Sequence, residues 1–170
     1  MDSESARMSS AAEARFRIDY PNSQPRVIKV VALDEASERV VKRVAQRSWQ
    51  RATFFTSIKF DGTARGGEGW SMQAWLSDLA GRTKALVEEV ASADLVVMVS
   101  SAGTSAQAAA VIGEACAVRK VMTMALIIGS EQRSDEELSK TLAALRPYAS
   151  MLVIASGDEY IEEMLAALRA

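Results

Sequence analysis

The chain has 170 residues, of which 49% are hydrophobic and 25% are charged, and its formal net charge is −2. This length suits a single domain with a sizeable core, and the weak negative charge provides no basic surface for nucleic acid. The sequence contains no histidine and one cysteine, Cys116. Catalysis by a Ser-His or Cys-His pair, a histidine-ligated metal and an internal disulfide are therefore excluded within one chain. We expect no metal site, and we expect Cys116 to be a buried, inert thiol in an alanine-rich helix.

The first residues predict an arm rather than a targeting signal. No apolar run reaches the roughly 18–20 residues that a membrane span needs, and the N-terminus lacks the apolar core of a signal peptide. Residues 1–25 are rich in serine, alanine and charge, and prolines Pro21 and Pro25 end this segment. These features predict a flexible N-terminal arm over residues 1–25, a single domain over residues 26–170, and a cytoplasmic protein without contact to a membrane.

From residue 26 onward, β-like and helical patterns alternate along the chain. Hydrophobic periodicity and turn residues predict, in chain order, a strand at 27–33, a helix capped by Asp34 or Ser37, a strand at 52–60, a loop at 61–69, an amphipathic helix at 70–90, a strand at 95–99, a helix at 105–117, a strand at 121–128, a helix at 134–145, a strand at 151–155 and a helix at 158–169. The predicted fold class is α/β, a three-layer Rossmann-like doubly wound parallel sheet. With the common strand order of that class, the turn after the first strand and the turn at 100–105 share one crevice.

Residues 100–105, between a strand and a small-residue helix, are the strongest candidate for a binding site. Gly103 lets the backbone approach a ligand, while hydroxyls and free N–H groups at a helix N-terminus suit an anion such as phosphate. An ordinary helix cap with a turn glycine is the alternative. The glycine-rich loop could close over the same anion, or it could be a plain connector. The candidate site residues are Ser100, Ser101, Gly103, Thr104 and Ser105, with Arg65, Gly66 and Gly67 from the loop.

Two observations argue against a standard dinucleotide or P-loop site. The turn after the first strand carries Asp34, Glu35 and Glu38, which would repel phosphate at a position where such a site needs glycine. The chain also lacks the Gly-Lys-Ser/Thr sequence of a Walker phosphate loop. A second group of acids, which includes Asp135 and Glu137, is typical of a helix start rather than of a metal site.

The order of these segments resembles the nucleotide-binding half of the FtsZ/tubulin family over residues 26–165. Residues 104–114 read Thr-Ser-Ala-Gln-Ala-Ala-Ala-Val-Ile-Gly-Glu, where the end of the family's signature and the next helix usually read Thr-Gly-Thr-Gly-Ala-Ala-Pro-Val-Ile-Ala-Glu. The resemblance implies a GTPase-domain fold and makes GTP or another nucleotide a candidate ligand, with no cofactor certain. Five further segments are similar to the family. Residues 28–32 and 40–44 resemble its first strand and helix, and residues 65–69 resemble its glycine-rich loop facing the terminal phosphate. Residues 93–99 resemble the strand before the signature, and residues 145–154 resemble a later strand.

The chain departs from the family pattern at the loops that would hold the nucleotide. Its first loop is acidic instead of glycine-rich, its signature keeps few glycines, and residues 156–159 replace the family's Asn-Asp/Glu-Arg. The sequence also lacks the long central helix and the second domain whose acidic loop completes GTP hydrolysis on a neighbouring subunit. We therefore expect a degenerate nucleotide site and a non-hydrolysing binding or interaction protein. Homo-oligomerisation or a protein partner, using Trp49, Trp70, Trp75 or the arm, is expected rather than catalysis.

A different resemblance concerns residues 100–105 alone. The turn Ser-Ser-Ala-Gly-Thr-Ser is similar to the Ser-Thr-Ser-Gly-Asn-Ser turn that grips a sugar phosphate in sugar isomerase (SIS) domains. This resemblance implies an alternative function, in which a small phosphate-ligand-binding protein takes a nucleotide or a sugar phosphate at that turn.

Overall fold

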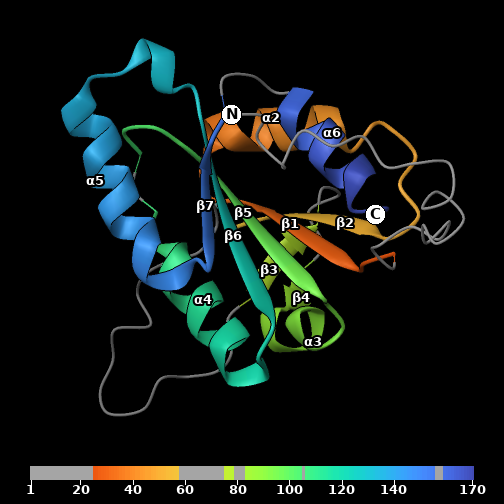
Figure 1. The fold of residues 1–170 in the computed structure, drawn as a ribbon. Helices are drawn as coiled ribbons and strands as arrows, with labels where there is room; N and C mark the ends of the chain where they lie inside the picture. Colours follow the sequence, from red (N-terminus) through yellow and green to blue (C-terminus); the bar gives the residue numbers. More distant parts are fainter. Residues whose placement is uncertain (1–24, 58–74, 79–82, 105, 156–158) are drawn as a thin grey trace, which may run out of the picture.

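A computed structural model describes residues 25–57, 75–78, 83–104, 106–155 and 159–170. Within these residues, a seven-stranded sheet has the strand order β4-β3-β2-β1-β5-β6-β7 (Figure 1). Apart from residue 25, the predicted arm lies outside the described residues, and so does the whole glycine-rich loop. The strands are β1 (Ile28–Ala32), β2 (Ala52–Thr56), β3 (Trp75–Asp78), β4 (Thr83–Ala85), β5 (Leu95–Ser101), β6 (Met122–Ile128) and β7 (Met151–Ile154).

Five of these strands, from β2 through β1, β5 and β6 to β7, run parallel to one another. β3 pairs antiparallel with β2, and β4 pairs antiparallel with β3. The predicted α/β class with a Rossmann-like parallel sheet is therefore confirmed for these five strands. The sheet as a whole is mixed rather than purely parallel, because β3 runs opposite to its two neighbours, β2 and β4.

Helices cover both faces of the sheet and produce three layers (Figure 1). They are α2 (Glu35–Val44), α3 (Leu86–Ala91), α4 (Ala108–Arg119), α5 (Asp135–Leu145) and α6 (Glu159–Ala167), with the short 3-10 helices η2 (Ser130–Gln132) and η3 (Arg146–Tyr148) on either side of α5. α2 and α6 pack on one face, and α3, α4 and α5 pack on the other. Because both faces are covered, every residue of β1 and β5 is buried. Among the described residues, no helix combines the length and the apolar character needed to cross a membrane.

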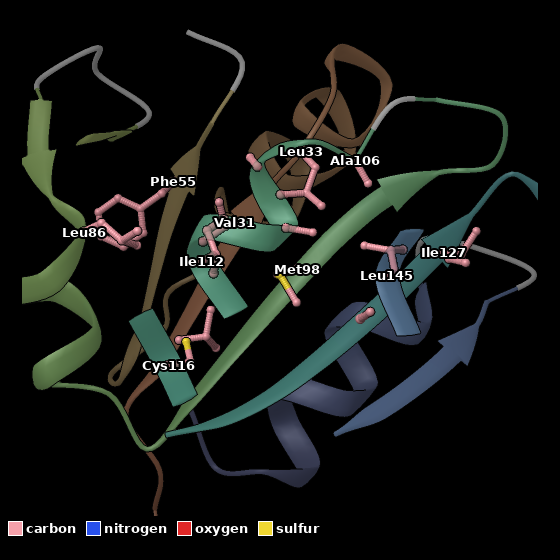
Figure 2. Packing of buried hydrophobic residues seen from close by; sticks show 14 of the residues in the cluster. Val31, Leu33, Phe55, Leu86, Met98, Ala106, Ile112, Cys116, Ile127 and Leu145 are labelled. Carbon is pink, nitrogen blue, oxygen red and sulfur yellow. The ribbon is translucent and has the colours of Figure 1, made fainter. Parts of the chain in front are cut away.

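The core between the sheet and α3, α4 and α5 is shown in Figure 2. Val31 and Met98 lie side by side on β1 and β5, and Ile112 and Cys116 of α4 belong to the same cluster, with all four side chains at 0% exposure. Burial raises the pKa of the Cys116 thiol to about 11, because the thiolate would lose its hydration there. The prediction that Cys116 is a buried thiol is confirmed.

The predicted helix over residues 70–90 is wrong at residues 75–78 and 83–85 and correct at residues 86–90. Residues 75–78 form β3, residues 83–85 form β4, and only Leu86–Ala91 is helical. β3 forms its ladder with the end of β2, and β4 extends that ladder. Pairing with a distant strand therefore overrides a local periodicity that suits a helix.

The helix after β5 also begins later than predicted, at Ala108 instead of residue 105. Gly103 has a φ of +83°, which lies in the left-handed region and does not continue a right-handed helix. The Thr104 N–H then closes a turn on the Ser101 carbonyl at 3.3 Å. A separate turn therefore stands between β5 and α4.

Two predicted helix starts are confirmed, each with a reciprocal capping box. Asp34, one of two candidates, is the N-cap of α2; it accepts the Ser37 N–H at 2.9 Å and donates its own N–H to Ser37 Oγ at 3.1 Å. Ser134 caps α5 in the same way with Glu137. The acids at the start of α5 therefore have the structural role that the sequence indicates.

Candidate functional site

The winding of the sheet reverses between β1 and β5. β1 is followed along the chain by β2 on one side, whereas β5 is followed by β6 and β7 on the other side. The Leu33 N–H donates to the Val99 carbonyl at 2.9 Å, so the carboxyl ends of β1 and β5 stay together. The predicted neighbourhood of the two turns is thus confirmed. In doubly wound folds, ligands bind at this reversal, which is called the switch point.

The Asp34 side chain occupies the switch point. Its Oδ2 accepts the Ser101 N–H at 2.8 Å and lies 3.0 Å from the Thr104 hydroxyl and 3.3 Å from the Ser100 hydroxyl. The Thr104 hydroxyl shares its proton between Oδ2 and the Ser101 carbonyl, which lies 2.7 Å away. Its Oδ1 accepts the Ser101 hydroxyl at 2.8 Å and the Ser37 N–H at 2.9 Å. One carboxylate therefore has five donor groups within hydrogen-bond distance, from the turn after β5 and from the first turn of α2.

Hydrogen bonding keeps this carboxylate ionised. Burial alone would raise the pKa of Asp34, but the bonds from Ser37, Ser101 and Thr104 together outweigh it and lower the pKa below its ordinary value of 3.8. The N-terminus of α2 favours negative charge as well. At neutral pH an anion is therefore already present at the position where the sequence suggested that one could bind.

The N–H groups of residues 101–104 are engaged, in contrast to the expectation that the turn offers free ones. Ser101 donates to Asp34, as described above, and Ala102 donates to the Ile128 carbonyl at 3.0 Å. Gly103 donates to the hydroxyl of Thr141 on α5 at 2.9 Å. The turn consequently directs its N–H groups into the protein, toward Asp34, β6 and α5.

Four of the eight candidate site residues can be placed. Ser100 and Ser101 are buried, Thr104 is half-buried and Gly103 is exposed, and the three hydroxyl residues meet around Asp34. The other four, Ser105, Arg65, Gly66 and Gly67, lie outside the described residues. Sequence reasoning considered Asp34 only as a cap and as a charge that repels phosphate. Asp34 comes directly after the first strand, beside the expected switch point, and this position in the sequence indicates that it can contact the turn after β5.

A pocket of about 630 Å³ opens on the other side of the turn, between α4 and α5. Small side chains and the Tyr148 ring line it, together with Gly103 and Thr104 from the turn and the polar residues Gln107, Glu137 and Lys140. This pocket was not predicted, because its walls come from helices that the sequence alone does not orient. Among the described residues, no group of three or more acidic or cysteine side chains is arranged to hold a metal ion.

Of the tryptophans predicted to form an interface, Trp49 can be described. Its ring nitrogen donates to the Val44 carbonyl at 2.9 Å, and its side chain packs partly buried against the core under α2 and α6. Trp75 lies on β3, and Trp70 lies outside the described residues. Trp49 therefore has a place in the packing of this domain.

No protein-family model matches the chain, and a search of curated proteins finds no match either.

Proposed function

We propose that this chain is an FtsZ/tubulin-like domain protein with a degenerate nucleotide site, which acts by binding or interaction and does not hydrolyse GTP. The observation that carries the proposal is the Asp34 carboxylate at the switch point, where five donor groups lie within hydrogen-bond distance of it. The segment order and the parallel strands on both sides of the switch point support the family resemblance.

Charge and hydrogen bonding both oppose a phosphate group at this turn. Two like charges about 4 Å apart repel by about 4 kcal/mol at the effective dielectric constant of a protein surface. A phosphate would also have to compete with Asp34 for the Ser101 N–H and for the hydroxyls of Ser101 and Thr104. The side chain thus acts as an internal occupant of the turn.

The alternative, a small phosphate-ligand-binding protein, uses the same donors. In that case Asp34 has to leave the turn before a nucleotide or a sugar phosphate can enter. The two proposals differ in one measurable property of the unmodified chain, namely whether a phosphate compound stabilises it.

A thermal-shift screen of the full chain with GTP, GDP and sugar phosphates tests this difference. A ligand present at 100 times its dissociation constant stabilises a protein by about 2.7 kcal/mol, which is easily detected. We expect no shift with any of these compounds and no release of phosphate from GTP above background. GTP turnover, or a rise in light scattering that depends on GTP, would contradict the proposal, and a shift with a sugar phosphate alone would favour the alternative.

A matched pair of variants examines whether Asp34 is the reason. Asp34→Ala removes the internal anion, so we expect inorganic phosphate to stabilise this variant and not the unmodified chain. Glu35→Ala is the control, because Glu35 is an exposed acid in the same helical turn. If phosphate stabilises both variants equally, charge in general and not the position of Asp34 excludes the ligand.

A further inference from the structure

The pocket between α4 and α5 has the dimensions of a small-molecule site. Its volume of about 630 Å³ falls within the roughly 300–1,000 Å³ typical of such sites. Ala106 and Ala110 line it from the side of α4, and Ala144 lines it from α5. These side chains end at Cβ, so they leave space between the helices and make this part of the wall apolar.

Two contacts at its margins hold the pocket in shape. Tyr148 of η3 lies so close to Gly113 of α4 that a Cβ on Gly113 would stand 2.5 Å from the Tyr148 Cβ. On the turn, the Gly103 N–H donates to the Thr141 hydroxyl, which in turn donates to the Glu137 carbonyl at 3.1 Å. Because these contacts connect α4 and its turn to α5 and η3, the pocket is formed before any ligand arrives.

Glu137 provides the pocket with an acceptor for a ligand. Its Oε2 accepts the Ser134 N–H at 3.1 Å and the Ser134 hydroxyl at 3.2 Å, whereas Oε1 accepts a longer hydrogen bond, at 3.4 Å, from the exposed Arg133 guanidinium with which it forms an ion pair. The bond from the Ser134 backbone is the main cause that lowers the pKa of Glu137, so the carboxylate is ionised at neutral pH. Oε1 is also the atom nearest to the space above Gly103.

The charged groups around Glu137 determine whether the pocket favours a cationic or an anionic ligand. Lys140 also lines the pocket, but its ammonium pairs with Glu136 at 2.8 Å. The first turn of α5 carries three acids against the two cations, Arg133 and Lys140, that pair with them, and the ionised Asp34 binds the loop turn at 101–104 from the opposite side. The field at this end of the pocket therefore favours a cation and disfavours a phosphate or a carboxylate.

We propose that this pocket binds a small organic cation with a flat apolar body, such as an aromatic amidine or amine. Its N–H donors meet Glu137 Oε1, and its ring lies between the alanines of the two helices and the Tyr148 side chain. Such a ligand replaces the water of the pocket with apolar contact, and it gains a charge-assisted hydrogen bond at one end. This site is separate from the switch point, and it does not depend on the proposed function.

An NMR titration of the full chain with benzamidine tests the site. Benzamide, which is neutral, and benzoate, which is an anion, are controls of the same shape. We expect saturable shifts of the Gly103, Gln107 and Ala110 amides with benzamidine, at least tenfold weaker binding of benzamide, and no binding of benzoate. Equal affinity for benzamidine and benzamide, or shifts centred elsewhere in the protein, would overturn the proposal.

Two acids of the same helix make a matched pair of variants. Glu137→Gln removes the charge and keeps the capping box, since glutamine serves at that position too, and we expect it to weaken benzamidine binding at least tenfold. Asp135→Asn removes an exposed acid of the same helical turn that does not line the pocket, and we expect less than a twofold change. Ala110→Leu places a large side chain in the pocket and should abolish binding. If Glu137→Gln binds benzamidine with unchanged affinity, Glu137 is not the acceptor for the ligand, whatever the result for Ala110→Leu.

Discussion

Two sides of one turn, residues 101–104, differ in what remains available to a ligand. On the side of the switch point, hydroxyl and N–H groups converge, but the Asp34 carboxylate already accepts them. On the side of α5, polar and apolar side chains line a pocket of about 630 Å³ that stays open beside Glu137. A dense cluster of polar side chains is therefore a poor guide to binding when its hydrogen bonds are satisfied internally. Open space beside an exposed charged side chain is the better guide.

The largest expected effect concerns the closed side of the turn. Asp34→Ala removes the N-cap of α2 and leaves the Ser101 N–H and hydroxyl without their acceptor. We expect the free energy of unfolding to fall by about 2–4 kcal/mol, since a lost cap costs about 0.5–2 kcal/mol and an unsatisfied buried donor about 1–3 kcal/mol. Urea denaturation measures this loss. Asp34→Asn keeps one acceptor oxygen, so its free energy of unfolding should fall by less. If Asp34→Ala changes the free energy of unfolding by less than about 0.5 kcal/mol, the bonds of Asp34 do not hold this turn closed.

The next effect concerns the contact that shapes the open side. Gly113→Ala places a Cβ 2.5 Å from the Tyr148 Cβ, so η3 has to move away from α4. Overpacking of this kind destabilises by about 1–3 kcal/mol, and we expect benzamidine binding to weaken in parallel. Gly129→Ala is the control. It strains a left-handed residue but has no atom within 4 Å of the new Cβ, so it should leave benzamidine binding unchanged. A stable Gly113→Ala variant with normal binding would show that η3 does not set the shape of the pocket.

The dependence of stability on pH separates the two carboxylates. The pKa of Asp34 is lowered in the folded chain, so its contribution to stability is complete above its unfolded value of about 3.8 and is lost as the pH falls through the folded value. The difference in unfolding free energy between the unmodified chain and Asp34→Asn should therefore be largest near neutral pH and shrink below about pH 4. Glu137→Gln should change the profile less, because the Glu137 carboxylate is exposed and solvent screens it. A constant difference for Asp34→Asn between pH 7 and pH 3 would show that its charge is not involved.

The smallest expected effect is an absence of reaction. Cys116 lies under α4 at 0% exposure with a pKa raised to about 11, so iodoacetamide should leave it unmodified in the folded chain at pH 8. Mass spectrometry after incubation measures the labelled fraction, with the chain in urea as the positive control. Labelling in the folded state at the rate seen in urea would mean that α4 does not stay packed on the sheet. The packing on which both sides of the turn depend would then be absent.

Local patterns were sufficient for much of the fold. Unbroken apolar runs predicted β1, β5 and β6, since a strand covered by helices on both faces has no polar side to present. Short-range capping predicted the starts of α2 and α5, because each cap bonds a residue three positions away. The segment at 75–85 could not be predicted in this way. Its strands depend on hydrogen bonds to β2, which lies far away in the sequence.

The sequence by itself determined which chemistry is present: hydroxyls at 100–104, an acid at 34, and no histidine or cysteine pair for catalysis or metal binding. Only the tertiary structure decided that Asp34 and Ser101, 67 positions apart, share hydrogen bonds. Their meeting requires β1 and β5 to be neighbours in parallel register, and that neighbourhood results from the packing of the whole sheet. The pocket between α4 and α5 has the same origin, since the distance between two helices depends on the side chains that pack at their contacts.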